Sequence, residues 1–246
     1  MNLDEEHRRA REFWNRRIML RAQAPSQFRY QYDFYNRYKE QLREPILDVG
    51  CGDGEFLEIL ISEGRKEIFG VDISDVAVGL ARERLRSYMP DVVDERIKTG
   101  DMIHLSEYYE EGFFNTILCE GTFHQTTYRG ARLTAVEMSK AVSKGGLIYI
   151  SVRSDSTPPR NADLLEDEIE TYRLRDEDGV ARCYFSEHGI RSLFEDEFEI
   201  LELEEKELLT KIGQERYKMR IMVMKKKSSN SLLSPLQKNG LELMAR

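Results

Sequence analysis

A short apolar run that ends in closely spaced glycines constrains the fold of this chain more than any other feature. Ile46 to Gly50 has the character of a buried strand, and Gly52 and Gly54 follow it before an apolar-periodic helix at 55–62. Glycine suits a sharp turn from strand to helix because it adopts positive φ without steric cost. The segment therefore predicts a strand–loop–helix unit whose loop can approach a ligand closely.

Strands and helices alternate after this unit. The predicted strands are 67–72, 96–100, 114–119 and 147–152. The predicted helices are 75–87, 106–111, 129–142, which a glycine turn at 145–146 caps, and 186–194. Strands joined by helices at this spacing favour right-handed crossovers and a parallel sheet. Two late strands, 197–203 and 216–224, are separated by a turn and predict an antiparallel hairpin at the sheet edge.

These patterns predict an α/β fold with a Rossmann-like, doubly wound, mostly parallel seven-stranded sheet, an antiparallel edge hairpin and an N-terminal helical lid. We assign residues 1–44 to a helical cap, with helices at 4–20 and 32–42, and residues 45–227 to the main domain. Within that domain, residues 154–185 are expected to be a long surface excursion. Residues 228–246 are expected to be a linker and a short tail.

Composition limits the partners of the chain. The formal net charge of −8 argues against a long nucleic acid as substrate, although arginines gather in the first helix among several carboxylates. The three cysteines are far apart and form no metal-binding pattern or disulfide framework. No metal is therefore expected. We find no membrane-length apolar run and no signal peptide, so a cytoplasmic location and no membrane partner are expected.

Two acidic residues stand at the ends of the first two predicted strands. Asp48 precedes Gly50 by two residues, where a carboxylate would repel a pyrophosphate but would attract a ligand with an ammonium group and a sulfonium. Asp72 ends the second strand, where it suits hydrogen bonds from the ribose hydroxyls of a nucleoside. A helix-capping role at this point fits Ser74 or Asp75 better.

Together these segments resemble the motifs of class I S-adenosylmethionine-dependent methyltransferases. The stretch from Pro45 to Leu57 looks like the first motif of the family, and Gly70 to Ser74 looks like the second. Weaker similarities lie at 99–102, 118–124 and 144–148. Within the family the chain is similar to the small single-domain enzymes, including those of the tellurite-resistance type.

The resemblance implies S-adenosylmethionine as cofactor and S-adenosylhomocysteine as product. It implies that the methionine end lies along Asp48, Gly50, Cys51 and Gly52, and that Asp72 takes the ribose. It implies further that Asp101 meets the adenine amino group, that Ile73 and Met102 pack on the adenine faces, and that Glu120 and Gly121 lie beneath the sulfonium. Many DNA-modifying enzymes of the family carry an Asn/Asp-Pro-Pro-aromatic segment here, and its absence argues against transfer to an exocyclic base amine.

The acceptor side is expected beyond the fourth strand. His124 is a candidate general base, with a hydrogen-bonding role as the equal alternative. His7, His104 and His188 are expected to have no proton role. Acceptor contacts are assigned by position to Tyr30, Tyr32, Tyr35, Gln125, Tyr128 and Arg153.

The expected function is methyl transfer to an oxygen or nitrogen of a small molecule by a monomer or homodimer. A methyltransferase that acts on RNA or protein is the first alternative, motivated by the arginine-rich first helix. A non-catalytic nucleoside-binding or scaffold protein on the same fold is the second.

Overall fold

A seven-stranded sheet forms the centre of the computed structural model, which describes residues 2–22, 33–166, 169–175, 179–209 and 216–228. The strand order is β3-β2-β1-β4-β5-β10-β9. Its strands are β1 (Ile46–Val49), β2 (Ile68–Asp72), β3 (Ile97–Thr99), β4 (Phe114–Glu120), β5 (Val142–Arg153), β9 (Phe198–Leu209) and β10 (Arg216–Lys226). The first five pair in parallel, and β10 is antiparallel to both β5 and β9. The predicted fold, including the edge hairpin, is confirmed.

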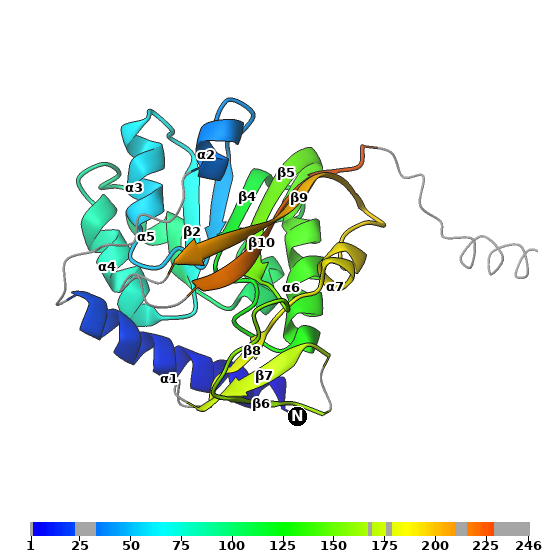
Figure 1. The fold of residues 1–246 in the computed structure, drawn as a ribbon. Helices are drawn as coiled ribbons and strands as arrows, with labels where there is room; N and C mark the ends of the chain where they lie inside the picture. The colour runs from blue at the N-terminus through cyan, green and yellow to red at the C-terminus, as the bar shows by residue number, and fades with distance from the viewer. Residues whose placement is uncertain (1, 23–32, 167–168, 176–178, 210–215, 229–246) are drawn as a thin grey trace, which may run out of the picture.

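Helices cover both faces of this sheet (Figure 1). One face carries α3 (Glu55–Ser62), α4 (Asp75–Leu85) and α5 (Val93–Arg96), and the other carries α6 (Tyr128–Ala141) and α7 (Glu187–Ser192). Their starts follow capping rules: Ser74 accepts a hydrogen bond from the Ala77 amide, and Ser186 accepts one from the Gly189 amide. Ser74 thus caps α4, which leaves Asp72 available to a ligand.

The core lies in two layers, one on each side of the sheet. On β4, Ile117 and Cys119 pack on the α6 side, whereas Leu118 packs with Ile46 on the α3 side. Alternate side chains of a strand point to opposite faces, so both layers draw on the same strands. Glu120 follows this alternation and therefore points to the same face as Leu118.

Helix α1 (Leu3–Ala22) lies beside a small second sheet at one end of the large sheet (Figure 1). The small sheet is antiparallel and consists of β6 (Ala162–Leu164), β7 (Thr171–Leu174) and β8 (Ala181–Cys183). The excursion that we expected at 154–185 is thus partly a sheet, which packs on α1 through Val180 against Ala10 and Phe13. Its strands are too short and too charged to show a strand periodicity in the sequence.

Several predicted element boundaries are wrong. The helix predicted at 106–111 is instead a 3₁₀ helix, η1 (Met102–Glu107), because the Asp101 side chain accepts a hydrogen bond from the Ile103 amide and starts the helix earlier. Helix α6 ends at Ala141, and β5 begins directly at Val142, so the glycine turn at 145–146 lies inside the strand. Helix α5 had no sequence signal. The predicted tail, from 229 onward, lies outside the described residues.

Helix α2 (Asp33–Tyr38) lies away from α1, at the end of the sheet where β1 begins (Figure 1). The chain after it is held by Arg65, which donates to the Lys39 and Leu42 carbonyls. The Tyr38 hydroxyl donates to Glu202 on β9. The second N-terminal helix therefore does not cover the same end of the sheet as the first.

Candidate active site

The glycine loop between β1 and α3 has the backbone that its sequence predicts. Gly50, Gly52 and Gly54 have φ values of 80°, 55° and 79°. A Cβ on Gly50 would come within 2.1 Å of the Thr122 hydroxyl oxygen, whereas a Cβ on Gly52 would have no neighbour within 4 Å. Gly50 is thus required for packing against the chain after β4, and the loop has open space at Gly52.

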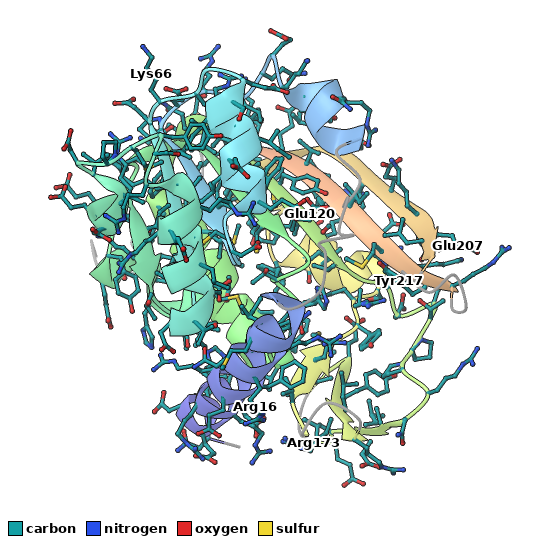
Figure 2. The ribbon with its side chains drawn as sticks, turned by 90° about the vertical axis from the view of Figure 1, so that its left-hand side faces the viewer. Arg16, Lys66, Glu120, Arg173, Glu207 and Tyr217 are labelled. Carbon is teal, nitrogen blue, oxygen red and sulfur yellow. The ribbon has the colours of Figure 1, made fainter. Side chains whose placement is uncertain are left out.

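Two carboxylates lie side by side at the start of this loop. Asp48 on β1 pairs in register with Leu118 on β4, so Glu120 lies one alternation further along on the same face. Burial, and then the nearby Asp72, raise the pKa of Asp48 to about 7. Burial, and then Asp48, raise the pKa of Glu120 to about 8. Glu120, labelled in Figure 2, is half-buried.

No described residue donates a hydrogen bond to either carboxylate. Buried carboxylates without donors are costly, and a cationic ligand removes that cost. The open space beside Gly52, and beside Gly121, whose Cβ would also have no neighbour within 4 Å, leaves room for such a ligand. The site therefore fits a cofactor that carries positive charge at this end.

Asp72 links the glycine loop to the start of α4. Its Oδ2 accepts from the Gly52 amide at 3.0 Å, and its Oδ1 accepts from the Ser74 amide at 2.9 Å. Burial raises the pKa of Asp72, and these two hydrogen bonds oppose that shift. Each oxygen has a second lone pair, so the carboxylate can still accept from a diol.

The Cys51 thiol fills the space behind this loop. Cys51 is buried, and burial raises its thiol pKa well above the usual value. A Cβ on Gly70 would come within 2.9 Å of its sulfur atom. The side chain therefore packs on β2, and only its backbone is available to a ligand.

Asp101 follows β3, at the same edge of the sheet. Its Oδ1 accepts from the Ile103 amide at 3.2 Å, and its Oδ2 lies 2.5 Å from Nδ1 of His7 on α1. Met102, which follows Asp101, and Ile73, which follows Asp72, are both half-buried. The contact with His7 was not predicted, because 94 residues separate the partners and nothing in the sequence pairs them.

His124 lies in the chain after β4 and is 2% exposed. Burial, and then the charges of Arg182 and Arg153, lower its pKa well below the usual value. Its Nε2 lies 3.1 Å from Nε2 of Gln125, whose Oε1 accepts from Arg182 at 2.9 Å. Among the described residues, its Nδ1 has no hydrogen bond of normal geometry. The imidazole is neutral at physiological pH and is held by its neighbours.

Two other candidate acceptor residues, Arg153 and Tyr128, make contacts with aromatic rings. The Arg153 guanidinium lies 3.8 Å from the centre of the Tyr217 ring, a cation–π contact at the end of β5. Tyr128 packs its ring on Phe185, with 6.0 Å between centroids. Tyr30 and Tyr32 lie outside the described residues. Tyr35 lies in α2, and its side chain is outside the described part of the structure.

The described part of the chain offers neither a metal-binding cluster nor a membrane-spanning helix. No group of three or more metal-binding side chains is placed to hold an ion there. Within those residues, no helix combines the length and the apolar character that a membrane span requires.

Comparison with known proteins gives a family and a fold. A family model described as "Methyltransferase domain" matches residues 42–219. A probable fatty acid methyltransferase of Pseudomonas putida is 27% identical over 104 residues, which is 42% of this chain and 25% of that protein. The ribosomal RNA large subunit methyltransferase G of Colwellia psychrerythraea is 29% identical over 84 residues, 33% of this chain and 21% of that protein. The chain thus spans about a quarter of the length of these curated relatives.

A solved structure of an S-adenosylmethionine-dependent methyltransferase from Methanosarcina mazei is similar in fold. Its TM-score is 0.65 at 20% identity, and the match covers 81% of this chain and 99% of that one. The cofactor is S-adenosylmethionine, and the unpartnered carboxylates and open loop described above fit it. The chain therefore belongs to the methyltransferase domain family, within the class I S-adenosylmethionine-dependent methyltransferases.

Proposed function

We propose that the protein transfers the methyl group of S-adenosylmethionine to an oxygen or nitrogen of a small-molecule acceptor. The observation that carries the proposal is a pair of carboxylates, the buried Asp48 and the half-buried Glu120, next to open space at Gly52 and Gly121. Neither accepts a hydrogen bond from a described residue. The cofactor supplies a methyl group already activated by its sulfonium. The protein therefore has to bind and orient the donor and the acceptor and to exclude water, rather than to activate the donor.

The cofactor roles follow the strand ends. We assign the ammonium group to Asp48, with the backbone of Gly50, Cys51 and Gly52 along the methionine chain. Asp72 accepts from the ribose hydroxyls, and Glu120 and Gly121 lie next to the sulfonium. Asp101 accepts from the adenine amino group, with Ile73 and Met102 on the faces of the ring.

On the acceptor side, the structure favours a positioning role for His124 over a proton role. A buried imidazole with a strongly lowered pKa is a weak base. Its contact with Gln125 instead fixes the amide between the Gly121 carbonyl and Arg182. Gln125, Tyr128 and Arg153 remain the proposed acceptor contacts, and Arg153 would suit a carboxylate or phosphate on the acceptor.

A small acceptor is supported by the neighbourhood of the site. Helix α1 and the small sheet lie beside the edge that carries the glycine loop (Figure 1). The exposed Arg8 of α1 is paired with Glu5 and Glu12, which reduces the basic character of that helix. We also propose a cytoplasmic location for the protein.

Two assays test this function. Calorimetric titration should show binding of S-adenosylmethionine and S-adenosylhomocysteine, and no binding of either would contradict it. Release of S-adenosylhomocysteine should then follow with small carboxylate, hydroxyl or amine acceptors. Product formation with any acceptor would also eliminate a non-catalytic scaffold role.

An RNA acceptor is the second candidate, favoured by the arginines of α1 and by the ribosomal RNA methyltransferase among the relatives. Retention of the protein on RNA at physiological salt, lost when Arg8, Arg9 and Arg11 are replaced by Ala, would support it. We expect no retention.

A further inference from the structure

His7 is a buried histidine on α1 whose two ring nitrogens reach two different parts of the site. The residue is 7% exposed. Its Nδ1 donates to Oδ2 of Asp101 at 2.5 Å, and its Nε2 lies 2.8 Å from the hydroxyl oxygen of Thr126. Asp101 follows β3, and Thr126 belongs to the chain between β4 and α6. A single side chain thus connects the adenine end of the site to the segment that leads to the acceptor.

The contact with His7 fixes the Asp101 carboxylate. Its other oxygen already accepts from the Ile103 amide, so both oxygens are held, each by one donor. Each oxygen keeps a second lone pair, and the residue is 9% exposed. The carboxylate is therefore held in one orientation and is still able to accept a further hydrogen bond.

Helix α1 is also tied to the ribose side of the site. The Asn15 amide accepts from the Ser74 hydroxyl at 2.6 Å and donates to Asp75 at 2.7 Å. The backbone amide of the same Ser74 donates to Asp72. Thus α1 contacts Asp101 directly and Asp72 through one intervening residue.

A third anchor joins α1 to the small sheet. Glu6, adjacent to His7, forms a two-point ion pair with Arg173 of β7, at 2.9 and 3.1 Å. Figure 2 shows Arg173 close to α1. Helix α1 is therefore anchored at three points, through Glu6, His7 and Asn15. Two of these anchors lead to Asp101 and Asp72, so the position of the helix is coupled to the residues that we propose for the nucleoside.

We propose that helix α1 is a part of the cofactor site, and that His7 is a positioning residue that aims the Asp101 carboxylate at the adenine amino group. The proposal rests on the proposed function, which places adenine at Asp101. It predicts that His7 contributes to the affinity for the nucleoside and to the recognition of its amino group, without contacting the methyl group.

Affinity for S-adenosylhomocysteine, measured by calorimetry, is the first test. His7→Ala should bind at least tenfold more weakly than the natural protein, since the carboxylate loses its donor. His7→Asn should recover part of the loss, because its side-chain amide can donate from nearly the same place as Nδ1. His104→Ala, which removes an exposed histidine three residues beyond Asp101, is the matched control and should bind normally. Circular dichroism of each variant establishes that it is folded.

The second test compares two ligands that differ only in the base. It distinguishes a role of His7 in positioning Asp101 from a role only in stabilising the fold. The probe is S-inosylhomocysteine, in which a carbonyl oxygen replaces the adenine amino group. The natural protein should prefer the adenine form, and His7→Ala should reduce that preference severalfold. Equal weakening of both ligands would overturn the proposal, because it would show only a stabilising role for α1.

Two further outcomes would also overturn it. Unchanged affinity in His7→Ala would mean that Asp101 needs no positioning, and tighter binding would mean that His7 competes with the ligand. A natural protein that binds neither ligand would instead contradict the proposed function, so the two failures are distinguishable.

Discussion

The two halves of the large sheet hold their candidate functional residues in different ways. On the β1–β2–β3 half, Asp48, Asp72 and Asp101 lie at or just after strand ends, and local hydrogen bonds to amides of the following residues hold two of them. On the β4–β5 half, Gln125 contacts His124 and is held by Arg182, which lies 57 residues further along the chain. The half that we propose for the cofactor thus depends largely on short segments, apart from the contact of the distant His7 with Asp101. The half that we propose for the acceptor depends on a distant arginine.

The largest effect should come from breaking the cofactor half at Gly50. We expect Gly50→Ala to reduce the free energy of unfolding by about 2–5 kcal/mol, because alanine disfavours positive φ and its Cβ would overlap Thr122. Gly52→Ala is the control, with positive φ but open space, and should cost about 1–2 kcal/mol. Urea denaturation of the ligand-free proteins measures both, and equal costs would refute the packing argument.

The next effect tests the ribose assignment. Asp72→Ala should weaken the binding of S-adenosylhomocysteine by about 1–3 kcal/mol, the usual range for losing hydrogen bonds to a charged group. Asp91→Ala, which removes an exposed carboxylate, should leave the affinity unchanged. If calorimetry finds the Asp72 variant binding normally, the ribose lies elsewhere.

Asp48 and Glu120 lie where the two halves meet. We expect the titration of Glu120 to make the free energy of unfolding depend on pH. The raised pKa of Glu120, about 8, means that the folded state holds its proton more tightly than the unfolded state. The favourable contribution of Glu120 is therefore complete below its ordinary pKa and is lost as the pH rises towards 8. Relative to the natural protein, Glu120→Gln should gain about 1 kcal/mol or more in unfolding free energy between pH 5 and pH 9.

Denaturation of the ligand-free proteins at several pH values measures this difference. Glu110→Gln, at an exposed position, serves as the control and should show no such trend. A constant difference between Glu120→Gln and the natural protein over this range would mean that Glu120 is ionised throughout.

The smallest effect concerns the tie between α1 and the small sheet. Arg173→Ala removes the partner of the buried Glu6 and should weaken S-adenosylhomocysteine binding two- to fivefold, by loosening α1. The control is Arg175→Ala, two residues from Arg173. It breaks the exposed ion pair between Arg175 and Asp163 and should leave the affinity unchanged. Calorimetric titration of both variants with S-adenosylhomocysteine measures the difference. Equal affinities would mean that the small sheet does not affect the cofactor site.

The distance along the chain between contacting residues explains what the sequence could predict. The glycine loop, the strand-end carboxylates and the Ser74 cap lie within short segments, so their spacing predicts their geometry. His7 and Arg182 act on residues 94 and 57 positions away, and no local pattern records such pairs. The small sheet at 162–183 was read as a surface excursion, because three- and four-residue strands carry no periodicity.

The central claim is that Asp48 and Glu120 receive the positive charges of S-adenosylmethionine. The most direct test is calorimetric titration near pH 7.5 in two buffers of different ionisation enthalpy. The raised pKa values predict that binding ionises both carboxyls and releases protons, more with S-adenosylmethionine than with S-adenosylhomocysteine, which lacks the sulfonium. Binding without proton release, or no binding of either ligand, would contradict the claim.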